Sequence, residues 1–111
     1  MLKWYSNLYI SDGAKNKASK IIRKINKNKG QLGAHIITLA TNQADQLEIL
    51  SANILLQKAA RNMCPMIVGI ANSYEEAVAL VVTITEEVYK ETQTTNIRAF
   101  IENKEMAQAN G

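Results

Sequence analysis

Several residue types are scarce in this chain of 111 residues, which has one cysteine, one histidine, one proline and one tryptophan. A single cysteine excludes a disulfide framework and a thiolate zinc site, and a single histidine removes most other transition-metal designs. No apolar run approaches the roughly 18 residues of a membrane-spanning helix. The first residues also lack the apolar stretch of about 7–15 residues that marks a signal peptide. We therefore expect a reduced, cytoplasmic protein that holds no metal or cofactor and does not enter a membrane.

The composition is that of one ordinary globular domain, with 47% hydrophobic and 21% charged residues. A chain of this length can bury one core and has no room for a second. We expect residues 1–101 to form a single domain, in which residues 1–12 are an aromatic N-terminal arm. Residues 102–111 show no apolar periodicity, so we expect a polar, disordered tail there.

Positive charge is concentrated in the first third of the chain. Residues 1–34 hold eight lysines and arginines against one acid, and the remainder holds five against nine, so balances of +7 and −4 sum to the net +3. Such asymmetry favours anionic partners without identifying one.

A helix with one basic face is predicted over residues 14–28. Apolar residues recur there at helical spacing, and Ser11-Asp12 and Gly30 are typical of its two ends. The lysines of the opposite face are candidates for binding nucleic acid or another polyanion. The same face is more typical of a solvated helix surface, because it lacks aromatic residues and contains only one arginine. A third alternative is contact with acidic segments of the same protein, across an oligomer. The candidates are Lys17, Lys20, Lys24 and Lys27.

Two strand–helix units follow in the sequence. Uncharged β-branched runs predict strands over residues 34–40 and 66–71, and each is followed by a predicted helix, over residues 43–62 and 74–92. Ser73 and Glu76 form a capping box at the start of the second of these helices. A shift of 31 residues aligns residues 35–50 with 66–81. We further expect a strand over residues 96–101.

These elements predict a small α/β domain with a three-stranded, mostly parallel sheet and three helices, in the order helix–strand–helix–strand–helix–strand. In such sheets ligands bind beyond the carboxyl ends of the strands. The residues there are also ordinary helix caps, and no glycine-rich phosphate loop accompanies them. The weak candidates for ligand binding at this edge are Thr41, Asn42, Asn72 and Ser73.

Some strings in the chain resemble a group of small uncharacterised proteins from Clostridia-type bacteria. They include Tyr9-Ile10-Ser11, the Ile21–Lys24 segment, residues 37–42 and Val68-Gly69-Ile70-Ala71, together with residues 74–77 and 86–89. The resemblance would cover about residues 9–101. It implies a bacterial cytoplasmic protein and no particular activity.

No set of residues predicts catalysis. His35 and Cys64 each begin a predicted parallel strand and could be neighbours, yet a buried, inert thiol is the commoner arrangement. Half of the six aromatic residues lie in the first nine positions, and a short sheet has exposed edges, so we expect a homodimer. Its candidate contacts are Trp4, Tyr5 and Tyr9. The sequence thus favours a non-catalytic, self-associating binding module, with a nucleic-acid-binding protein or a small-ligand or enzymatic domain as alternatives.

Overall fold

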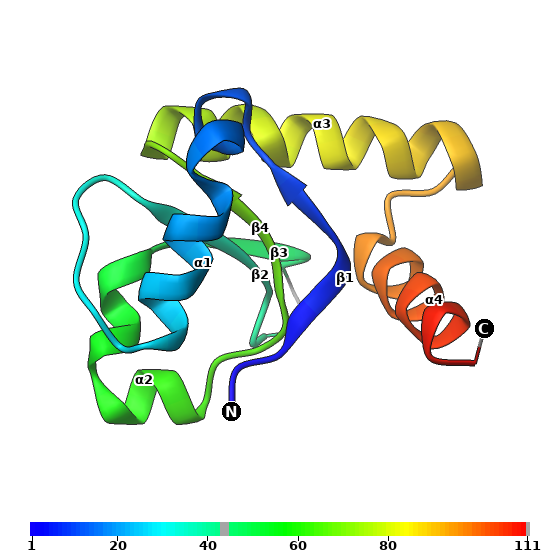
Figure 1. The fold of residues 1–111 in the computed structure, drawn as a ribbon. Helices are drawn as coiled ribbons and strands as arrows, with labels where there is room; N and C mark the ends of the chain where they lie inside the picture. Colours follow the sequence, from blue (N-terminus) through cyan, green and yellow to red (C-terminus); the bar gives the residue numbers. More distant parts are fainter. Residues whose placement is uncertain (43–44, 111) are drawn as a thin grey trace.

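Four strands form one mixed sheet in the order β1-β4-β2-β3 (Figure 1). This computed structural model describes residues 1–42 and 45–110. Strand β1 runs parallel to β4, whereas β2 runs antiparallel to both β4 and β3. The elements in chain order are β1 Trp4–Ile10, η1 Asp12–Lys17, α1 Ala18–Asn26, β2 His35–Leu39, β3 Leu47–Ser51, η2 Ala52–Leu56, α2 Lys58–Asn62, β4 Ile67–Ala71, α3 Tyr74–Thr92 and α4 Ile97–Asn110.

Helices cover both faces of the sheet and create two cores. Helices α1 and α2 lie on one side of the strands in Figure 1, and α3 and α4 lie on the other. Because successive side chains of a strand point to opposite faces, Ile36 of β2 joins the core under α1, and its neighbour Ile37 joins the core under α3 and α4. Both isoleucines are fully buried. The expected α/β class is confirmed.

Two of the predicted helices are confirmed. The basic helix begins with the 3-10 turn η1, continues as α1 and buries Ile21 and Ile25, as expected from their spacing. Helix α3 starts where the capping box predicts, since the Ser73 hydroxyl accepts a hydrogen bond of 3.1 Å from the backbone N–H of Glu76. Local signals were sufficient for both elements.

The expected parallel sheet of three strands is wrong, because part of the predicted 43–62 helix is strand β3. Thr41 and Asn42 do not cap a helix; the Asn42 side chain accepts a hydrogen bond of 2.8 Å from the Asp45 N–H. Strand β3 then returns antiparallel beside β2. In place of the predicted helix the structure has β3, the 3-10 helix η2 and the short α2, so the two strand–helix units are not structural repeats.

Both ends of the chain also differ from expectation. The aromatic arm is strand β1, and the strand expected over residues 96–101 is the first part of α4, which Asn96 starts by accepting a hydrogen bond from the Ala99 N–H. Helix α4 continues through the expected disordered tail to Asn110. The spacing of Ile97, Phe100 and Ile101 is helical, and all three are buried in the core under α3 and α4.

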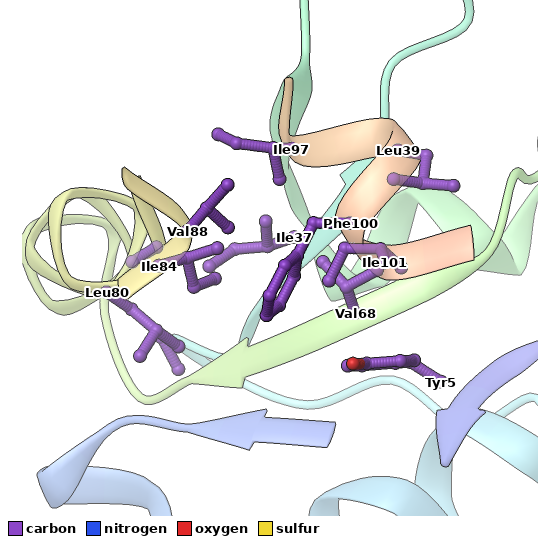
Figure 2. Close-up of a cluster of buried hydrophobic side chains, with 12 residues drawn as sticks. Tyr5, Ile37, Leu39, Val68, Leu80, Ile84, Val88, Ile97, Phe100 and Ile101 are labelled. Carbon is purple, nitrogen blue, oxygen red and sulfur yellow. The ribbon is translucent and has the colours of Figure 1, made fainter. Parts of the chain in front are cut away.

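Figure 2 shows Phe100 and Ile101 beside Ile37 and Val68 of the sheet, so α4 is part of the core. We predict that Ile101→Ala lowers the free energy of unfolding by about 2–5 kcal/mol, because it leaves a cavity in the place of a fully buried side chain. Met106→Ala on the same helix is the control, since Met106 is exposed and its loss should cost under about 0.5 kcal/mol. Urea unfolding measures both. Equal, small effects would mean that α4 does not close the core.

Candidate interface at the free edge of the sheet

The four strand-end candidates do not form one site. Thr41 and Asn42 follow β2, and Asn72 and Ser73 follow β4. Because β2 and β4 are antiparallel, with His35 opposite Ala71, these two pairs lie at opposite ends of the sheet. Thr41 instead binds the β3 side chain Glu48, whose carboxylate accepts hydrogen bonds from the Thr41 N–H at 2.9 Å and hydroxyl at 3.0 Å.

The carboxyl ends of the parallel pair β1 and β4 do meet, but a carboxylate of the chain already lies between them. The Glu76 side chain accepts a hydrogen bond of 2.6 Å from the Ser11 hydroxyl, and a longer one of 3.4 Å from the Asn72 N–H. It also lies so close to Gly13 that a Cβ there would fall 2.2 Å from a Glu76 oxygen. An anionic ligand is therefore disfavoured in the space between Ser11 and Gly13 that the Glu76 carboxylate occupies. The sequence identified Glu76 only as a helix cap.

The three aromatic candidates for a dimer contact are partly or wholly used within the chain. Tyr5 is buried in the core beneath α3 and α4. Tyr9 stacks on it with ring centroids 6.1 Å apart, and burial together with a hydrogen bond to Glu87 raises the pKa of Tyr9. The Trp4 indole N–H donates to the side-chain oxygen of Asn26 at 3.0 Å. A partner would find Tyr5 inaccessible.

The four candidate lysines lie along η1 and α1 on the outer side of this helical segment. Lys17, Lys20 and Lys27 are exposed, and Lys24 is half-buried. Three of them, Lys17, Lys20 and Lys24, line a hollow of 220 Å³ together with residues of the loop before β2, whereas Lys27 does not. The structure therefore separates Lys27 from the other three lysines, which the sequence alone did not distinguish.

His35 and Cys64 are not neighbours, which corrects the possibility that parallel strands suggested. His35 lies opposite Ala71 at the far end of β4, whereas Cys64 lies before the start of that strand. The His35 ring packs edge-on against Tyr74 at 5.9 Å, and its Nδ1 lies 2.7 Å from the Gly33 carbonyl oxygen. No imidazole is therefore available to activate the thiol.

The two outer strands of the sheet differ in how their edges are covered. Strand β1 has an irregular register between Trp4 and Tyr9, and α4 shields it. The Glu105 carboxylate accepts hydrogen bonds of 2.8 Å from both the backbone N–H and the hydroxyl of Ser6. Bulges and inward-reaching charges of this kind prevent an edge from pairing with another chain.

Strand β3 has no such protection. Among the described residues, β2 is its only strand partner. The bonds from the Ala52 N–H to Ala34 and from the Ala40 N–H to Gln46 fix the ladder, in which even-numbered residues of β3 bond to β2. Odd-numbered residues therefore turn their N–H and C=O groups outward; they are Leu47, Ile49 and Ser51. The strand contains no lysine or proline, and Glu48 is occupied by Thr41.

Helix α3 adds exposed apolar surface beside this edge. At about 100° per residue, its four exposed apolar side chains fall within about 80° of one another. The side of α3 that carries Thr83 and Glu87 borders Tyr9 of β1, so the exposed apolar stripe lies on the other side, toward β3. Tyr74 at its start contacts His35 of β2. The stripe consists of Tyr74, Val78, Val82 and Tyr89, which are 40–58% exposed.

Within the described residues, no three histidine, cysteine or acidic side chains converge in an arrangement that could hold a metal ion, and no helix has the length and apolarity to cross a membrane. No protein-family model matches the chain, and no curated protein or solved structure is significantly similar to it.

The surroundings of Cys64 predict slow thiol chemistry. Burial raises the pKa of the Cys64 thiol, and the lowering effect of Arg61 is smaller. We expect Ellman's reagent to react with the folded protein at a rate that rises at higher pH than the rate for the urea-unfolded chain, because less thiolate is present at a given pH. Stopped-flow absorbance across pH 7–10 in both states measures this. A lower midpoint in the folded protein would indicate an activated cysteine.

Proposed function

We propose that this chain is a non-catalytic interaction module that self-associates through β3. The unpaired outer edge of β3 carries the proposal, because an exposed strand with unprotected hydrogen-bonding groups is a template for another strand. Its contrast with the shielded β1 edge favours pairing at one side of the sheet only. Such pairing produces a closed dimer, since it uses the one sheet edge that the described residues leave open.

A second copy of β3 is a suitable occupant for this edge. In an antiparallel pair centred on Ile49, the two copies of Ile49 face each other and Leu47 faces Ser51. All of these residues have outward N–H and C=O groups, so each facing pair exchanges two hydrogen bonds. Glu48 then lies opposite Leu50, and no two carboxylates oppose each other across the seam. The strand is therefore self-complementary in both hydrogen bonding and charge.

The apolar stripe on α3 supports the same two-fold arrangement. A two-fold axis perpendicular to the sheet places both α3 helices on one face, on either side of the seam. The stripes of the two copies then face each other above the paired strands. Contiguous apolar surface of this kind marks interaction sites more often than scattered single residues do. Joining the copies would remove Val82 and Tyr89, each about half exposed, from water.

The cytoplasmic location and the resemblance to Clostridia-type proteins stay predictions. They are compatible with the proposal, because a reducing compartment would keep Cys64 as a free thiol, as it is in the structure. The pairing itself needs no cofactor or metal.

We predict that Ser51→Pro abolishes the dimer and preserves the fold. Ser51 has a φ of −63°, which proline adopts without strain, and its N–H points away from β2. Proline therefore removes an outward donor without breaking a bond to β2. We expect the wild type to have twice the 12.3 kDa mass of one chain by sedimentation equilibrium, and Ser51→Pro to raise the dimer dissociation constant by at least about tenfold.

Ser51→Ala is the matched control. It removes the hydroxyl that accepts a hydrogen bond from the Asn53 N–H but keeps the backbone donor, so the dimer should persist. Val82→Glu tests the α3 stripe separately and should also favour the monomer, because it places like charges near the seam. A wild type that is monomeric at every accessible concentration contradicts the proposal. So does a Ser51→Pro protein that remains as dimeric as Ser51→Ala.

A further inference from the structure

A basic hollow lies beside α1, on the face of the sheet opposite α3. One wall consists of Lys17, Lys20 and Lys24, which recur at helical spacing along η1 and α1. The other wall consists of the loop residues Gln31, Leu32 and Ala34 together with Asn72, and Ile21 also contributes to the lining. The fold thus brings together residues that the sequence placed in two separate candidate sets.

The carboxylate of Glu76 adjoins the wall of the hollow through its hydrogen bond of 3.4 Å with the Asn72 N–H, but Glu76 is not part of the lining. The lining contains three lysines and no acidic residue. The ion pairs of the described residues join Lys15 to Asp12 and Lys104 to Glu91, so none of the three lysines takes part in one. Like charges held around a concave surface repel one another, and a bound anion would relieve that repulsion.

The loop wall is fixed in place before any ligand binds. The Gln31 N–H donates to the Asn53 side chain at 3.0 Å, and the Gln31 side chain donates to the Ile21 carbonyl at 3.3 Å. Gly33 has a φ of +79°, and a Cβ at this position would fall 3.1 Å from the Asn72 carbonyl oxygen. The loop therefore approaches Asn72 closely, and a rigid wall reduces the entropy cost of binding.

The size and rim of the hollow limit what it can hold. A volume of 220 Å³ is below the range of about 300–1,000 Å³ usual for whole drug-sized ligands, so it suits the charged end of a ligand. Leu32 at the rim is 98% exposed and offers apolar surface to the rest of such a ligand. Extended nucleic acid would instead need a continuous basic track that also uses Lys27.

We propose that this hollow binds the phosphate group of a small phosphate monoester, whose organic part lies against Leu32. Lysines supply charge-assisted hydrogen bonds to phosphate oxygens, and the hollow is lined by three of them together with the polar residues Gln31 and Asn72. The lining contains no residue of β3, so binding here does not require the proposed dimer.

Phenyl phosphate and inorganic phosphate are the probes, titrated into the ¹⁵N-labelled protein and followed by NMR. We expect saturable shifts centred on the backbone amides of Gln31–Ala34 and Asn72, with phenyl phosphate binding more tightly. Lys20→Gln should weaken both probes by about tenfold, because it removes a charged donor to the phosphate. Leu32→Ser should weaken phenyl phosphate alone.

Lys27→Gln is the matched control, since Lys27 is an exposed lysine at the other end of the same helical segment and outside the hollow. It should change neither affinity. Shifts that fail to saturate, or that spread evenly over all lysine-bearing segments, overturn the proposal. A single-stranded oligonucleotide that binds more tightly than phenyl phosphate, and loses as much affinity with Lys27→Gln as with Lys20→Gln, also overturns it in favour of a polyanion surface.

Discussion

The antiparallel pairing of β2 with β4 is the constraint on which the rest of the structure depends. It places His35 opposite Ala71 and Ile37 opposite Gly69, near the centre of the sheet. Gly69 leaves room for two neighbouring side chains, because a Cβ there would approach Ile37 and Leu80 to 3.3 Å. The direction of β2 also decides which loops meet: it separates the turn after β2 from the start of α3 and brings the loop before β2 to Asn72.

Elements set by local chemistry were predictable from the sequence. The start of α3 follows from a hydroxyl and a carboxyl group three residues apart, and α1 follows from isoleucines at helical spacing. Strand β3 was missed because Leu47, Leu50 and Ile54 fit a helical period as well as Leu47 and Ile49 fit an alternating one. The pairing with β2, whose residues lie outside this segment, decides between the two periods. Helix α4 was missed although Ile97, Phe100 and Ile101 have helical spacing.

The same distinction applies to the candidate sites, where local exposure was predictable and the relative position of residues was not. The exposure of Lys17 and Lys20 was predictable, but their position on the same hollow as Asn72 was not. It depends on a glycine with positive φ and on the direction of one strand. The difference between the shielded β1 edge and the open β3 edge could not be predicted from the sequence, because the shielding contact joins Glu105 to Ser6, 99 residues apart.

The contact between Glu105 near the end of the chain and Ser6 near its start affects the order in which the fold is completed on the ribosome. Strand β1 is synthesised first. In the described residues its strand partner is β4, the last strand to be made, and the helix α4 that shields it follows later still. The β2–β3 hairpin needs only its own neighbours and forms early by comparison. The β3 edge is therefore present in the growing chain before the β1 edge is paired and shielded.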